Sequence, residues 1–163
     1  MDSARWKIAI LGAGVVGTSL GRALRERGHE IVGVVTRSEA SARRAAEAIG
    51  GGVPAGVDAA GAAARADLVL LTTPDRAIAE VCEEVARRGG FRRGSVAAHA
   101  SGALDSEALA AARRAGCDTG SLHPLGTFAR ADPASFTGIY FFFEGTPRAE
   151  QVLADLAREL GGV

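Results

Sequence analysis

The sequence predicts an α/β fold in which helices cover both faces of a doubly wound, mostly parallel β-sheet. Short apolar runs alternate with helix-like segments along the chain, as expected for parallel strands joined by helices. A glycine-rich turn follows the first apolar run and opens the first helix-like segment. With 163 residues, the chain has the length of a single domain with a substantial core.

Each expected strand is a short apolar run. The first run is interrupted only by Lys7, which is typical of a strand buried on both faces. The last run is rich in aromatic residues. The expected strands are 6–11, 31–36, a short strand within 50–58, 68–72, 95–99, 118–122 and 139–143.

Each expected helix has an apolar face or a start or stop signal. Leu20 and Leu24 share one face of the first helix, and Gly28 ends it. Ser38 is suited to cap the second helix. Threonine–proline pairs start the fourth and the last helix, with the threonine, Thr73 in the fourth helix, as the expected cap and the proline in the first turn. The expected helices are 15–27, 38–49, 59–65, 73–88, 105–114 and 146–160.

Composition and charge argue against several classes of function. The formal net charge is zero, so there is no electrostatic basis for binding nucleic acid or an acidic membrane surface. No apolar run approaches the length of a bilayer span, and the first residues show no secretory pattern. Cys82 and Cys117 lack metal-ligand spacing, so we expect no metal and a cytoplasmic location. Lys7 is the only lysine and opens the first strand, so no lysine chemistry is expected.

The glycine-rich turn has the spacing G-x-G-x-x-G between a strand and a helix, which indicates a dinucleotide site in a Rossmann-type fold. The first glycine permits the tight turn, the second lets a pyrophosphate approach, and the third allows close helix–strand packing. The helix N-terminus offers N–H groups to the anion. The alternative is a turn without a ligand. The expected cofactor-binding residues are Gly12, Ala13, Gly14, Val15, Val16 and Gly17.

The end of the second strand predicts which dinucleotide binds. A site for NAD places a carboxylate there to bind the ribose 2′-hydroxyl, whereas this chain has Thr36, Arg37 and Ser38. Arginine pairs with phosphate and the hydroxyls can donate to it, so we expect NADP(H). Arg43 and Arg44 on the next helix could add positive charge. The alternative is that Arg37 is solvated and the site accepts either dinucleotide.

Thr72, Thr73 and Pro74 follow the strand at 68–72, at the edge where open parallel sheets bind ligands. We expect them beside the ribose and nicotinamide half of the cofactor. Their role in starting a helix is compatible with that position.

Two of the three histidines are expected at the same edge, each just after a strand. His99 is followed by Ser101 and Gly102, and His123 follows the next strand. Imidazole suits general acid–base work, while Ser101 and Gly102 could bind a substrate carboxylate or carbonyl. His123, Ser101 and His99 are therefore the candidate catalytic residues. The alternative is that each histidine only bonds a nearby backbone carbonyl. His29 lies at the opposite edge, where a turn or helix-end interaction is expected.

Four segments in this order resemble the Rossmann-like/DUF2520 family: residues 12–17, 36–38, HASGA at 99–103 and GSLHPL at 120–125. That family is related to coenzyme F420-dependent NADP oxidoreductase-like proteins and to the 6-phosphogluconate dehydrogenase-like superfamily. The resemblance covers essentially the whole chain, and the two histidine segments are more specific than the glycines. It implies an NADP(H)-binding Rossmann domain. Some relatives resemble ketopantoate reductases, which use NADPH.

A second resemblance concerns prephenate dehydrogenases. These enzymes carry a serine after the corresponding strand and a His-Pro segment whose histidine contacts the substrate hydroxyl. Ser101 and the segment His123-Pro124-Leu125-Gly126-Thr127 resemble those two elements. The resemblance implies a substrate-side role for His123 and leaves the substrate open.

The family resemblance also implies a second domain. Family members continue into an all-helical C-terminal domain that closes the substrate cleft and usually makes the dimer. Residues 1–163 are thus expected to be the NAD(P)-binding domain, with the helical domain after residue 163 and a homodimer as the assembly. The alternative is a natural single-domain relative. This domain alone could bind cofactor without catalysis. The late aromatic residues are expected to serve core and inter-domain packing: Phe128, Phe136, Tyr140, Phe141, Phe142 and Phe143.

Two functions remain. The first is an NADPH-dependent reductase or dehydrogenase, similar to ketopantoate reductase, that acts on a small carboxylate-bearing carbonyl compound or hydroxy acid. In this enzyme His123 exchanges the proton, helped by His99, and Ser101 orients the substrate. The alternative is a non-catalytic NADP(H)-binding module that senses redox state. Methyl transfer from S-adenosylmethionine fits less well, because Arg37 suits a 2′-phosphate better than an adenosyl ribose. A small-molecule substrate is the expected partner, and whether F420 participates stays open.

Overall fold

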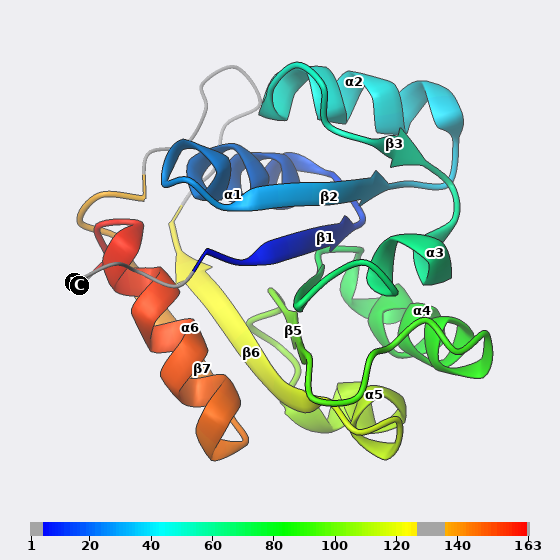
Figure 1. Ribbon diagram of the computed structural model, residues 1–163. Coiled ribbons are helices and arrows are strands. Elements are labelled where there is room, and N and C mark those ends of the chain that lie inside the picture. The colour runs from blue at the N-terminus through cyan, green and yellow to red at the C-terminus, as the bar shows by residue number, and fades with distance from the viewer. Residues whose placement is uncertain (1–4, 127–135, 163) are drawn as a thin grey trace.

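The strands of the described residues form one sheet in the order β3-β2-β1-β4-β5-β6-β7 (Figure 1). The computed structural model describes residues 5–126 and 136–162. Neighbouring strands are parallel except β6 and β7, which are antiparallel. The strands are β1 (Lys7–Leu11), β2 (Glu30–Val35), β3 (Ala55–Gly56), β4 (Leu68–Leu71), β5 (Val96–His99), β6 (Asp118–Leu125) and β7 (Tyr140–Gly145). This confirms the predicted doubly wound, mostly parallel α/β fold.

Helices cover both faces of the sheet (Figure 1). One face carries α1 (Val15–Glu26), α2 (Glu39–Ile49) and α6 (Pro147–Glu159). The other carries α3 (Ala59–Ala63), α4 (Asp75–Arg87) and α5 (Ala110–Arg114), the last preceded by the 3₁₀ turn η1 (Ser106–Leu109). No helix within the described residues is long and apolar enough to cross a membrane.

The core has two halves because side chains of a strand alternate between the faces of the sheet. In β1, Ile8 and Ile10 pack under α1, α2 and α6, while Ala9 and Leu11 pack toward α3, α4 and α5. All four are almost completely buried. A strand buried on both faces explains why the first apolar run has no polar alternation.

The strand order has a topological switch point between β1 and β4. The chain moves outward from β1 through β2 to β3 and then returns to β4 on the other side of β1. Open α/β sheets bind ligands outside the carboxyl ends of the strands at such a switch point.

Three predictions about helices and strands need correction: the type of one helix, the cap of another and the end of β6. The expected helix at 105–114 is a 3₁₀ turn followed by a short helix. Pro74, and not Thr73, is the N-cap residue of α4, and no side chain caps that helix. β6 continues through Leu125, so His123 and Pro124 lie inside the strand and not after it. The cause is pairing with β7, which extends β6 beyond its last pair with β5.

Candidate functional site

The sequence-predicted residues meet at one edge of the sheet, here called the carboxyl edge. β1, β2, β4 and β5 all end there, and the segments that follow them carry the glycines, Thr36–Ser38, Thr72–Pro74 and the HASG residues. The opposite edge, where these strands begin, is here called the amino edge.

The three motif glycines have different surroundings in the structure. Gly12 has φ +89°, and an added Cβ would collide with Thr73. An added Cβ at Gly17 would collide with the Thr72 side chain and the Gly12 carbonyl, so α1 packs closely on the sheet there. At Gly14 an added Cβ would meet no atom of the described residues within 4 Å. Gly14 is therefore the one of the three that faces open space.

The first turn of α1 adds hydrogen-bond donors to that space. Gly14 is the N-cap residue of α1, and no side chain caps the helix. The N–H groups of a first helical turn have no partner within the helix, so they remain available to an anion. Ala13, Val15 and Val16 are half-buried.

The two threonines after β4 line the glycine turn. The Thr72 hydroxyl donates to the carbonyl of Gly12, which ties β4 to the turn. The Thr73 hydroxyl is buried and has no hydrogen-bond partner among the described residues. A buried hydroxyl without a partner is destabilising, and such an atom beside a glycine turn fits a site completed by a polar ligand. Pro74 is exposed next to it.

The end of β2 presents a free cation. Arg37 is exposed and makes no ion pair or hydrogen bond with any residue that the structure describes. The Thr36 hydroxyl donates to the carbonyl of Ser38 at 2.8 Å, and the Ser38 hydroxyl accepts the N–H of Ser41 at 3.2 Å. The predicted cap at Ser38 is confirmed. Thr36 thus already uses its proton, while Ser38 keeps its own for donation.

His99 is a buried residue whose ring connects two parts of the loop after β5. Only 1% of the His99 surface is exposed. The N–H of Ser101 donates to Nδ1 of His99 at 3.2 Å, and Nε2 lies 2.9 Å from the carbonyl of Asp105. Since a carbonyl only accepts, the ring carries its proton on Nε2. Both nitrogens of His99 are therefore occupied by the backbone.

His123 is half-buried and keeps one nitrogen free. Its Nδ1 lies 3.1 Å from the carbonyl of Ala100, so Nδ1 donates, and Nε2 has no hydrogen-bond partner within the described residues. Ser101 lies in the same loop. Its hydroxyl accepts the N–H of Ala103 at 3.1 Å and retains a proton for donation. The fold thus brings His123 and Ser101 together with unused hydrogen-bonding capacity.

Two groups that fix the positions of Ser106 and His123 could not be predicted from the sequence. Glu144 of β7 accepts hydrogen bonds from the N–H and the hydroxyl of Ser106 at 2.6 and 2.9 Å. The Ala100 carbonyl, which orients His123, is a backbone group and is invisible to residue patterns. Glu144 is a single glutamate within an aromatic strand, and its contact with Ser106 becomes evident only once β7 is placed.

The late aromatic residues divide into two sets. Phe136 and Phe141 are buried and their ring centroids lie 5.7 Å apart, as expected for core residues. Tyr140, Phe142 and Phe143 are exposed by 63%, 65% and 41%, so core packing is the wrong expectation for them. They lie on β7, the last strand of the sheet order, where one side has no covering strand among the described residues. Thr127 and Phe128 lie outside the described residues.

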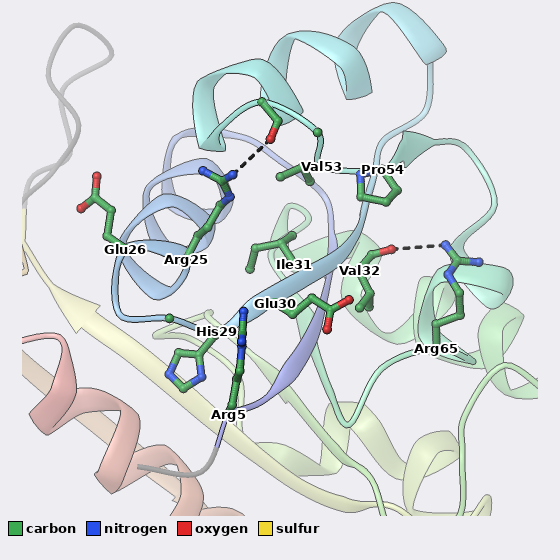
Figure 2. A pocket seen from close by; sticks show the side chains of 13 residues that line it. Arg5, Arg25, Glu26, His29, Glu30, Ile31, Val32, Val53, Pro54 and Arg65 are labelled. Atoms are coloured by element: carbon green, nitrogen blue, oxygen red, sulfur yellow. Dashed lines mark hydrogen bonds between the residues drawn. The ribbon is translucent and has the colours of Figure 1, made fainter. Parts of the chain in front are cut away.

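The amino edge contains a cavity of about 610 Å³ (Figure 2). Arg25 and Arg65 lie on opposite sides of it, and each donates to a backbone carbonyl, that of Gly51 at 3.1 Å and that of Val32 at 3.4 Å. His29 also lines it. The cavity lies at the edge opposite the glycine turn, and none of the site residues predicted from the sequence lines it.

His29 connects three elements at the amino edge. The N–H of Trp6 donates to its Nδ1 at 3.2 Å, and its Nε2 lies 2.8 Å from the Glu159 carboxylate of α6. Its own N–H donates to the carbonyl of Leu24 in the last turn of α1. The expected helix-end interaction is present, and the ring additionally binds α6 to the sheet.

The two thiols are buried under the α4 face of the sheet. Burial raises the pKa of the Cys82 thiol to about 11 and also raises the pKa of Cys117. Both therefore stay protonated at neutral pH, a state that neither attacks substrates nor binds metals. Within the described ranges no group of three or more His, Cys, Asp or Glu side chains could hold a metal ion.

Comparison with known proteins identifies a family and a set of similar structures. A family model described as a Rossmann-like domain matches residues 1–124. The search of curated proteins gives no match. A Bacteroides fragilis protein proposed to be an NADP oxidoreductase is 27% identical, with a TM-score of 0.83 over 96% of this chain and 58% of that one.

Two dehydrogenase structures have the same fold at lower identity. An arogenate dehydrogenase from Synechocystis is 22% identical, with a TM-score of 0.79 over 96% of this chain and 58% of its own. A prephenate dehydrogenase from A. aeolicus, in complex with hydroxyphenyl propionate and NAD⁺, is 16% identical, with a TM-score of 0.80 over 100% and 60%. The present chain thus spans about three fifths of the length of these three proteins.

Proposed function

The chain belongs to the Rossmann-like domain family, and from this premise we propose that it is the NADP(H)-binding domain of a reductase or dehydrogenase. The observation that carries the proposal is the open space over Gly14 at the start of α1, which no described side chain caps. In the same turn, Gly12 packs against Thr73, whose buried hydroxyl has no hydrogen-bond partner among the described residues. These features fit a pyrophosphate, which needs close backbone approach and N–H donors. The similar structures that name NADP or NAD⁺ support a nicotinamide dinucleotide as the ligand.

The preference for NADP(H) over NAD(H) rests on Arg37. The carboxylate that would bind a ribose 2′-hydroxyl is replaced by an exposed guanidinium that no described carboxylate neutralises. A guanidinium binds a phosphate through charge-assisted hydrogen bonds. The Ser38 hydroxyl, which still has its proton, supplies a second donor. The Thr36 hydroxyl is left with a structural role in the turn.

The proposed reaction is the interconversion of a small carboxylate-bearing carbonyl compound and its hydroxy acid. When bound, the nicotinamide supplies or accepts the hydride. His123 exchanges the proton on the substrate oxygen through Nε2 and keeps its Nδ1 proton on the Ala100 carbonyl. In the reductive direction it starts protonated on both nitrogens and ends with the Nδ1 proton alone.

Ser101 and Gly102 are the proposed substrate-orienting groups. The Ser101 hydroxyl proton is uncommitted, and the N–H of Gly102 makes no hydrogen bond with the described residues. Two adjacent donors suit a carboxylate or carbonyl oxygen. His99, whose nitrogens are both occupied, takes a positioning role in this proposal and not a proton-transfer role.

A titration with NADPH and NADH in parallel tests the cofactor assignment. We expect NADPH to bind at least about tenfold more tightly, which corresponds to about 1.4 kcal/mol at the 2′-phosphate. Arg37→Asp should remove this preference. Arg93→Asp is the matched control, because Arg93 is equally exposed and lies at the amino edge.

Three other outcomes contradict parts of the proposal. Equal affinity for both nucleotides overturns the NADP preference. An unchanged preference in Arg37→Asp removes Arg37 from the site. Absence of binding by either nucleotide overturns the cofactor-binding function itself.

A further inference from the structure

The loop after β5 is fixed at several points. His99 binds the Ser101 N–H and the Asp105 carbonyl, Glu144 binds Ser106, and the Ser121 hydroxyl donates to the Ser101 carbonyl at 3.3 Å. The loop is therefore anchored to its own strand, to β6 and to β7. Atoms carried on such a loop have defined positions relative to β6.

The His123 ring is in contact with this loop in two ways. Its Nδ1–H donates to the carbonyl of Ala100. Its other side rests on Gly102, where an added Cβ would lie 2.5 Å from Nε2, 2.7 Å from Cδ2 and 2.8 Å from Cε1. Separations this short do not occur between non-bonded atoms, so a side chain at position 102 and the present ring position exclude each other.

The three distances also show which part of the ring faces Gly102. A Cβ approaching in line with the Nε2 lone pair would be much farther from Cδ2 and Cε1 than from Nε2. Nearly equal distances instead place it over the ring face. The in-plane direction at Nε2, along which a proton is exchanged, is thus not the direction that Gly102 occupies.

We propose that Gly102 is a positioning residue for His123: the absence of a side chain lets the ring lie against the loop, which holds Nδ1–H on the Ala100 carbonyl and leaves Nε2 as the exchanging nitrogen. The part of this proposal that concerns catalysis rests on the proposed function. The ring position and its tautomer do not, and they can be measured without cofactor or substrate.

Gly102 offers a clean substitution. It is exposed, and its backbone does not adopt the positive φ that would strain another residue. Alanine at this position should therefore fold and act only through its methyl group. Gly51, at the amino edge, is the matched control, because it also lacks a positive φ and an added Cβ there meets no atom within 4 Å.

The test is ¹⁵N NMR of the three histidine rings in the chain, wild type against Gly102→Ala and Gly51→Ala. Wild-type His123 should show a protonated Nδ1 and an unprotonated Nε2 in its neutral form, whereas His99 should show the reverse. In Gly102→Ala the His123 signals should shift toward a mixture of tautomers. The His29 and His99 signals should not change, and Gly51→Ala should leave all three rings unaltered.

Two results overturn the proposal. If the His123 signals in Gly102→Ala match the wild type, the ring does not depend on the missing side chain. If all three histidines change, the substitution acts through the fold and not through ring position.

A kinetic arm tests the functional part separately. Gly102→Ala should bind NADPH within about twofold of wild type, while kcat with an active 2-keto acid falls by roughly 10²-fold, as for a proton carrier misplaced by about 1 Å. An unchanged kcat alongside the NMR shift overturns the catalytic part. Failure of the wild type to bind NADPH contradicts the proposed function and leaves the NMR test intact.

Discussion

The two edges of the sheet differ in how fully their polar groups are satisfied. At the amino edge, Arg25 and Arg65 donate to backbone carbonyls, and both nitrogens of His29 have partners. At the carboxyl edge, the buried Thr73 hydroxyl and Nε2 of His123 have no hydrogen-bond partner among the described residues. The amino edge nevertheless holds a cavity of about 610 Å³. The proposed function therefore follows unused hydrogen-bonding capacity and not empty volume.

The largest expected effect separates His123 from His29. His123→Gln should lower turnover of NADPH with a 2-keto acid by about 10²–10⁴-fold, the usual contribution of a general acid or base, with NADPH affinity unchanged. His29→Gln should leave turnover of the folded protein unchanged. If the two variants lose activity equally, the comparison between the edges fails. Cofactor binding without any wild-type turnover would favour a non-catalytic binding module.

For stability the order of the two histidines should be reversed, with the larger loss on substitution of His29 and the smaller on substitution of His123. His29→Leu removes the hydrogen bonds to the Trp6 N–H and to Glu159, while keeping most of the side-chain volume. We expect the free energy of unfolding to fall by about 1–3 kcal/mol in urea denaturation, with NADPH affinity unaltered. His123→Gln should cost less than about 1 kcal/mol. A larger cost at His123 than at His29 contradicts this account.

Alanine substitutions of Gly14 at the carboxyl edge and Gly51 at the amino edge should differ in their effect on cofactor affinity. Gly14→Ala places a methyl group where no atom of the described residues lies within 4 Å, so the free energy of unfolding should change by no more than about 1 kcal/mol. Affinity for NADPH should fall by at least about tenfold if the pyrophosphate lies there. Gly51→Ala should leave affinity unchanged, and calorimetric titration of both variants measures the difference. Equal affinities would place the pyrophosphate elsewhere.

The smallest effect concerns Arg43, an exposed residue of α2 without an ion pair among the described residues. Arg43→Gln should weaken NADPH binding by about two- to threefold, because exposed charges contribute less than about 1 kcal/mol. The effect should disappear in high salt, which screens exposed charges. Arg93→Gln at the amino edge should have no effect at either salt concentration. An effect that persists in high salt would indicate direct contact with the 2′-phosphate.

The sequence predicted those features that depend on short stretches of chain. Alternating strands and helices indicated the fold, and the Ser38 cap and the positive φ of Gly12 follow from local spacing. These features depend on neighbouring residues and on the geometry of a strand–turn–helix unit.

Features that depend on distant pairing were not predictable from local patterns. His123 lies inside β6 because Phe142 of β7 pairs with it, and nothing near His123 in sequence signals that partner. The same pairing places Phe142 and Tyr140 on the outer strand and leaves them exposed. His99 was a candidate proton carrier because of its residue type and its place at the end of a strand. Only the folded loop reveals that the Ser101 and Asp105 backbone groups occupy both its nitrogens.

The most direct test of the central claim is to map NADPH binding on the backbone amides of the isotopically labelled chain by NMR. The account predicts large shift changes at Gly12–Gly17 and Thr36–Ser38, smaller ones at Thr72 and Thr73, and none around the amino-edge cavity at Gly28, His29 and Gly51. Shift changes centred on the amino edge, with the glycine turn unaffected, would contradict it.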